Sequence, residues 1–94
     1  MESQDSSVFE DAADRLVRLY DQEFGSKVRG RYRISMKYLR ALTGRRRLYP
    51  DDIERLRRQL YERGFVLIDL ETYCAVVSLR TFNSYRRVSE RALT

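Results

Sequence analysis

Residues 50–79 read PDDIERLRRQLYERGFVLIDLETYCAVVSL and decide the fold of this chain. The first half predicts a helix over residues 50–63. Pro50 suits the first helical position because it has no N–H to lose, and acidic residues fill the first turn, where the helix dipole favours them. The apolar residues recur at helical spacing and form one stripe, which consists of Ile53, Leu56, Leu60 and Tyr61. Gly64 then ends the helix.

The second half of the stretch predicts a β-hairpin. Residues 65–70 and 73–79 are two β-prone runs on either side of Glu71-Thr72, and an antiparallel pair is the simplest arrangement for them. The turn lacks the glycine that a tight two-residue loop prefers, so the sequence leaves the strand ends open. Cys74, inside the second run, is expected to be a small buried residue.

Three elements are predicted before this stretch. A helix over about residues 7–24 begins at Ser7, which starts a capping-box pattern. A short strand is expected over residues 31–34, where polar and apolar residues alternate. Ser35 caps a second helix, which ends at Thr43-Gly44.

The two ends of the chain are predicted to differ. Residues 1–6 are expected to be a disordered acidic N-terminus, and residues 7–94 to form a single domain. Thr81 is predicted to cap a last helix over about residues 81–92. The apolar side chains of that helix are expected to face inward, and they are Phe82, Tyr85, Val88 and Ala92.

This order of elements resembles the winged helix–turn–helix domain over about residues 7–80. The spacing Ile53, Leu56, Leu60, followed by Gly64-Phe65, carries most of the resemblance. In winged-helix proteins the third helix typically ends in a glycine and an apolar residue, and the chain then enters the first strand of the wing.

The resemblance implies an α+β fold with a three-helix core, a β-hairpin wing over about residues 65–79 and a C-terminal helix. It also implies binding of double-stranded DNA. The helix over residues 50–63 would enter the major groove, and the hairpin tip would lie against the backbone or the minor groove.

Charge along the chain is strongly polarised. The formal net charge is +5, and it divides into −5 over residues 1–26, +9 over residues 27–64 and +1 over residues 65–94. The basic middle segment coincides with the helix–turn–helix part of the pattern, where bases can neutralise phosphates.

The candidate DNA-binding residues all lie in this middle segment. They are Arg45, Arg46, Arg47, Lys37, Arg40, Arg55 and Arg58. Two structural roles for these bases remain as alternatives to DNA binding. A basic loop can pair with the acidic first helix, and exposed arginines can pair with acids of their own helix. A GC-rich genome would also raise the arginine content.

Some residues depart from the pattern of the family. Asp51, Asp52 and Glu54 stand at the start of the expected recognition helix, where they would repel phosphate, and the hairpin tip carries Glu71 and no base. The sequence is therefore consistent with two functions. The first is a small DNA-binding transcriptional regulator or mobile-element accessory factor, and the second is a protein–protein interaction module without DNA binding. RNA binding is a more distant alternative.

Composition also sets expectations about partners and chemistry. A homodimer is expected through the first helix, the hairpin or the C-terminal helix. The chain has no histidine and one cysteine, so we expect no metal site, no disulfide, no cofactor and no enzymatic activity. No signal-like or membrane-spanning stretch is found in the sequence, and we expect a cytoplasmic protein.

Overall fold

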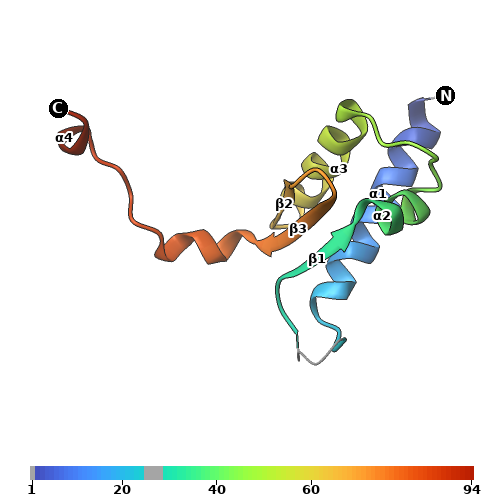
Figure 1. The fold of residues 1–94 in the computed structure, drawn as a ribbon, viewed down its shortest axis with the longest axis horizontal. Coiled ribbons are helices and arrows are strands. Elements are labelled where there is room, and N and C mark those ends of the chain that lie inside the picture. The colour runs from blue at the N-terminus through green and yellow to red at the C-terminus, as the bar shows by residue number, and fades with distance from the viewer. Residues whose placement is uncertain (1, 25–28) are drawn as a thin grey trace.

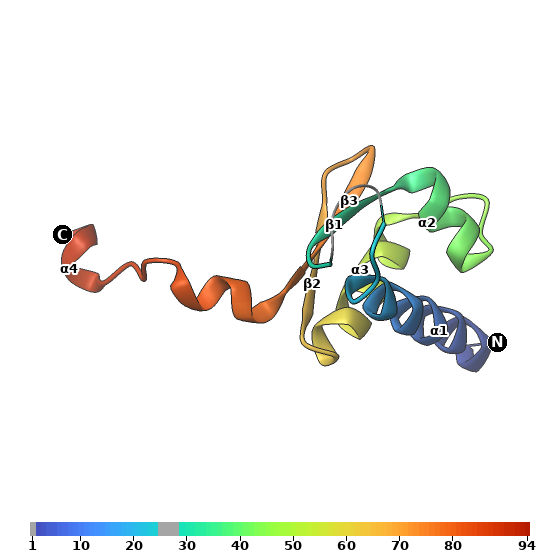
Figure 2. The same ribbon diagram turned by 90° about the horizontal axis from the view of Figure 1, so that it is seen from below.

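A three-stranded sheet and three helices form the body of the protein, and residues 79–94 project from it (Figures 1 and 2). The computed structural model describes residues 2–24 and 29–94, with side chains from residue 7 onward. The elements follow in this order: α1 (Glu2–Tyr20), β1 (Tyr32–Ser35), α2 (Met36–Thr43), α3 (Pro50–Glu62), β2 (Phe65–Asp69), β3 (Tyr73–Ser78), the 3-10 helix η1 (Leu79–Ser84) and α4 (Glu90–Leu93). The predicted α+β class is confirmed.

The sheet is antiparallel and has the order β1-β3-β2, so β3 is paired on both sides. In this register Cys74 lies opposite Ile34 of β1, and Val76 lies opposite Leu67 of β2. Cys74 and Val76 are fully buried, because alternate residues of a strand point to the same face. The predicted short strand, hairpin and buried cysteine are confirmed.

The hairpin turn lies between β2 and β3. The Leu70 N–H donates to the Tyr73 carbonyl at 2.9 Å, and the Asp69 carboxylate accepts the Glu71 N–H at 2.9 Å. Glu71 adopts a positive φ of 75°. The acidic side chain before the turn therefore helps to hold a turn that has no glycine.

The core lies where α1, α2 and α3 pack on one another and on the sheet. α3 contacts α1 on one side and β2 on the other. Its apolar stripe is buried as the sequence predicts for Ile53, Leu56 and Leu60, whereas Tyr61 is 61% exposed. The largest fully buried side chains from the other elements are Phe9, Leu16, Leu39 and Leu67.

The ends of α2 and the start of α3 are as predicted. The Ser35 hydroxyl accepts the Tyr38 N–H at 3.2 Å and caps α2. Gly44 takes a left-handed conformation with φ 71° and ends α2 with hydrogen bonds back to the carbonyls of Arg40 and Ala41. Pro50 is the first residue of α3.

The predicted bounds of the first helix are wrong at both ends. α1 begins at Glu2, so Ser7 lies inside the helix and Glu2–Ser6 belong to it instead of forming a disordered tail. No proline or glycine interrupts residues 2–6, and acidic residues suit a helix N-terminus. α1 ends at Tyr20, whose carbonyl accepts the Gly30 N–H at 2.9 Å. The predicted stop at Gly25 lies outside the described residues.

The predicted C-terminal helix over residues 81–92 is also wrong. Ser78 caps η1 by accepting the Arg80 N–H at 3.3 Å, residues 85–89 form no helix, and α4 is a single turn. The Tyr85 and Val88 side chains, expected to face inward, are 62% and 73% exposed. The sequence has the apolar spacing, but these side chains are not part of the hydrophobic core.

Residues 79–94, which we call the arm, make the chain unusually extended. The radius of gyration is 15.1 Å, whereas a compact chain of this length has about 12 Å. Figures 1 and 2 both show the arm leaving the end of β3 and running away from the body.

A matched pair of valine substitutions tests this division between body and arm. In dilute protein, Val76→Ala should lower the free energy of unfolding by about 1.5–3 kcal/mol, because it leaves a cavity in the core. Val88→Ala should change it by less than about 0.5 kcal/mol, because the side chain is exposed. Urea denaturation followed by circular dichroism measures both values. A cost at Val88 similar to that at Val76 would mean that the arm packs on the body.

Candidate nucleic-acid interface

The seven candidate residues lie on α2, on the connection of residues 44–49 and on α3. Lys37, Arg46, Arg47, Arg55 and Arg58 are exposed, and Arg40 and Arg45 are half-buried. The two half-buried arginines differ in their surroundings. Arg40 lines a groove at the surface, whereas Arg45 faces α1 and α3.

Arg45 fastens the connection to the body. Its guanidinium lies 5.1 Å from the centroid of the Phe9 ring, and its Nη1 is 3.7 Å from Oδ1 of Asp52. Asp52 Oδ2 also accepts the Tyr49 N–H at 2.9 Å, and this carboxylate is only 10% exposed. The Asp52 carboxylate therefore caps the N-terminus of α3 through Tyr49 and pairs with the charge of Arg45.

This arrangement changes the significance of the acids at the start of α3. Asp52 points into the protein, where Arg45 offsets its charge, so it does not add to the exposed acidic surface. Asp51 is exposed and Glu54 is half-buried. At the start of α3, only the carboxylates of Asp51 and Glu54 are therefore placed to repel phosphate, instead of the three that the sequence predicts.

Glu54 lies between two arginines of the same helix. Its carboxylate is in ion-pair contact with Arg57, and its Oε2 lies 4.0 Å from Nη2 of Arg58. The Arg57 side chain is 50% exposed and that of Arg58 is 72% exposed. Exposed pairs of this kind stabilise a helix only slightly, so both guanidinium groups can turn toward another anion.

A groove brings basic residues of two helices together. Its volume is about 1020 Å³, and its walls come from α2, the first half of α3 and the hairpin tip. The bases that line it are Lys37, Arg40 and Arg57, and the acids are Asp51, Glu54, Asp69 and Glu71. The Met36 N–H donates to the Thr72 carbonyl at 3.1 Å and holds the tip against the start of α2.

Sequence reasoning missed Arg57 and the arginines of the arm. Arg57 lies on the flank of α3 that faces the hairpin, between the buried stripe and the most exposed side. Its position next to the apolar stripe in the helical periodicity is the sequence signal that points to this flank. The net charge of +1 over residues 65–94 combines the arm with the acidic hairpin, and it hides the four arginines of the arm. These are Arg80, Arg86, Arg87 and Arg91. Considered alone, the arm has one acid, Glu90.

Two other groups bear on the chemistry of the protein. Burial, with a smaller contribution from the charge of Asp69, raises the pKa of Cys74 to about 11, so the thiol is neutral at ordinary pH. Arg63 donates to Asp14 at 2.8 Å and joins α3 to the acidic side of α1.

Among the described residues, no group of three or more His, Cys, Asp and Glu could hold a metal ion.

In the described part of the chain, no helix has the length and apolar character needed to cross a lipid bilayer. No family model, curated protein or solved structure matches the chain.

Neighbouring aspartates test the role of the Arg45–Asp52 contact. Asp52→Ala should lower the free energy of unfolding by about 1–2 kcal/mol, because Tyr49 loses its hydrogen-bond acceptor and Arg45 its charge partner. Asp51→Ala, at the exposed position next to it, should cost at most about 0.5 kcal/mol. Thermal and urea unfolding measure the difference, and equal costs would contradict a fastening role for Asp52.

Proposed function

We propose that this chain is a winged-helix protein that binds double-stranded DNA and acts as a transcriptional regulator or a mobile-element accessory factor. The order α1-β1-α2-α3-β2-β3 and the sheet order β1-β3-β2 support the winged-helix assignment. In such a domain α3 is the helix that enters the major groove, and the β2–β3 hairpin is the wing.

The observation that carries the proposal is the groove that Lys37 and Arg40 of α2 share with Arg57 of α3. Bases from two consecutive helices at one groove can contact neighbouring phosphates along one side of the helix that enters the DNA. Arg58 adjoins Arg57 at a smaller cleft on the surface of α3. Arg46 and Arg47, exposed in the connection, extend the basic surface toward the DNA backbone.

The acidic hairpin tip affects which surface of the protein would lie against the DNA. Asp69 and Glu71 line the far side of the groove, so the tip does not suit close contact with phosphate. The DNA therefore lies nearer to α2, the connection and the exposed face of α3 than to the wing. Arg45 supports this surface from inside, because its guanidinium is held by Phe9 and Asp52.

Three double variants and salt titration test the proposal. Lys37→Ala/Arg57→Ala and Arg46→Ala/Arg47→Ala should each weaken binding to a mixed-sequence duplex about tenfold at about 50 mM salt. Each should also reduce the salt slope by about 2, because two phosphate contacts are lost. Arg15→Ala/Arg18→Ala removes the same charge from exposed positions on α1 and should have a much smaller effect. Fluorescence anisotropy at about 50 and 200 mM salt provides the measurement.

Two results would overturn the proposal. One is the absence of duplex binding at the lower salt concentration. The other is equal weakening by all three double variants, which would show that only net charge matters.

A gain of affinity at Glu54 is a second test. Glu54→Gln should tighten duplex binding about threefold, because it removes a negative charge from the groove and releases Arg57 and Arg58. Glu62→Gln is the control, since it makes the same change at an exposed position at the end of α3. Tighter binding by both variants in equal measure would argue against a local role for Glu54.

The four acids of the groove favour a second candidate, a winged-helix protein–protein interaction module without DNA binding. A mixed-charge groove between α2, α3 and the hairpin tip suits a peptide that carries both signs of charge. Recovery of a stoichiometric protein partner that survives nuclease treatment and is lost on Glu54→Gln would support this candidate. It would count against the first if duplex binding is also absent.

A further inference from the structure

The arm of residues 79–94 carries apolar side chains that its own chain leaves exposed. Tyr85, Val88 and Leu93 are 62%, 73% and 78% exposed. The Phe82 and Tyr85 rings contact each other edge to face, with centroids 5.1 Å apart, so the arm presents them as a preformed pair. Apolar surface of this kind is stable in water chiefly when something covers it.

The exposed surface of the whole chain is larger than its mass requires. It amounts to 7693 Å², whereas a compact protein of this mass exposes about 5,700 Å². The excess of about 2,000 Å² exceeds the roughly 800 Å² that each partner buries in a standard interface. The excess surface of one chain is therefore larger than one side of a standard interface requires.

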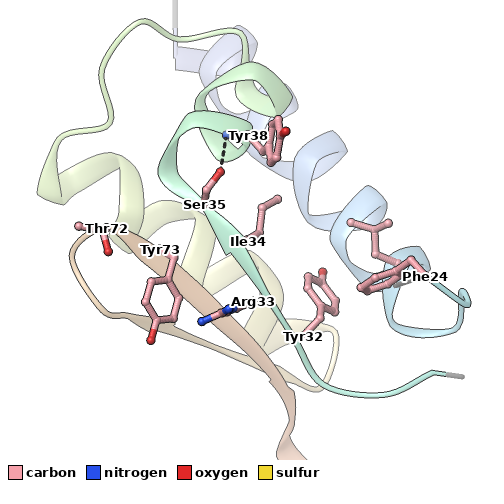
Figure 3. Close-up of a pocket in the computed structure, with 9 residues that line it drawn as sticks. Phe24, Tyr32, Arg33, Ile34, Ser35, Tyr38, Thr72 and Tyr73 are labelled. Atoms are coloured by element: carbon pink, nitrogen blue, oxygen red, sulfur yellow. Dashed lines mark hydrogen bonds between the residues drawn. The ribbon is translucent and has the colours of Figure 1, made fainter. Parts of the chain in front are cut away.

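A pocket of matching chemistry lies along β1 (Figure 3). We call it the β1 pocket; its volume is about 560 Å³, and most of its lining is apolar or aromatic. Figure 3 shows Phe24 beyond the end of α1, Tyr32 and Ile34 on β1, and Tyr38 on α2. The Phe24 and Tyr32 rings meet edge to face at 5.7 Å, and Phe24 and Tyr38 are 45% and 63% exposed.

Aromatic and apolar side chains, and not charge, match the arm to this pocket. Among the described residues that line the pocket, the charged side chain is that of Arg33. On the arm, Arg86 and Arg87 directly follow Tyr85 and are exposed. The contact would therefore be made between the aromatic pair of the arm and the aromatic rings of the pocket.

We propose that the arm of one copy lies in the β1 pocket of a second copy, so that two copies form a dimer by exchanging arms. The Phe82–Tyr85 pair packs on Phe24 and Tyr38 of the other copy. The two rings that the arm would contact, those of Phe24 and Tyr38, do not line the groove between α2 and α3, although Ser35 and Thr72 border both cavities.

The direction of the arm favours a second copy over the pocket of the same chain. The Leu79 N–H donates to the Gly64 carbonyl at 2.9 Å, and Ser78 caps η1, so the arm leaves β3 on a fixed course. The six residues of η1 carry the chain about 12 Å away from the sheet. Phe82 lies within η1 and Tyr85 follows it, so they could return to their own body only if η1 came apart.

Sedimentation of the full chain without DNA tests the proposal over about 1–100 µM protein. The unaltered chain should dimerise, and Phe82→Ala/Tyr85→Ala should raise the dimer dissociation constant at least about tenfold. Tyr38→Ala should weaken the dimer in the same way from the pocket side. Tyr61→Ala, which removes an equally exposed ring from α3, should leave the dimer intact. Circular dichroism confirms that each variant is folded.

Mixing an arm variant with a pocket variant distinguishes a dimer that exchanges arms from an arm that folds back onto its own chain. An arm variant (Phe82→Ala/Tyr85→Ala) mixed with a pocket variant (Tyr38→Ala) restores one intact arm–pocket contact, so a heterodimer should form more tightly than either homodimer. A full chain that stays monomeric throughout the concentration range would overturn the proposal. A dimer that survives both sets of substitutions, or mixing without effect, would overturn it as well.

Discussion

The double pairing of β3 is the constraint on which the rest of the structure depends. β1 and β2 bond to its two edges, and Cys74 and Val76 on its inner face are fully buried among the helices. The start of β3 follows the hairpin tip, which is bonded to the first residue of α2 through Met36 and Thr72. The residue after its end, Leu79, is bonded to Gly64 and sets the course of the arm. One strand thus positions both the groove and the arm.

Burial and pairing decide how the arginines of the middle segment can act. Arg45 and Arg63 are committed to contacts within the body, with Asp52 and Asp14. Arg57 and Arg58 share one carboxylate at the surface, where an ion pair is weak and exchanges readily for another anion. The arginines of this segment are therefore of two kinds, those that hold the fold and those that face outward. The second group supports the proposed DNA contact.

Local signals predicted most of the body. Pro50, Ser35 and Gly44 mark helix ends whose backbone chemistry is determined by those residues themselves, and the structure confirms each one. The alternation in residues 31–34 and the β-prone runs predicted all three strands. These predictions succeed because a cap or a strand depends on a few neighbouring residues.

The remaining features depend on contacts between distant residues. The apolar spacing of residues 81–92 indicates a buried face, but spacing cannot say whether the covering surface belongs to the same chain. The inward orientation of Asp52 depends on where Arg45 and Phe9 lie in space. At the candidate site, sequence named Lys37 and Arg40 but not Arg57, because only the folded hairpin makes that flank of α3 a wall of the groove.

Duplex DNA is proposed to contact this chain at α2, the connection of residues 44–49 and the exposed face of α3. Backbone amide chemical shifts, recorded by NMR while a short duplex is added at low salt, test this proposal most directly. Binding at this surface should give the largest changes at Lys37, Arg40, Arg46–Arg47 and Glu54–Arg58, with small changes along the middle of α1. Changes centred on α1 or on the β1 pocket, or no changes at all, would contradict it.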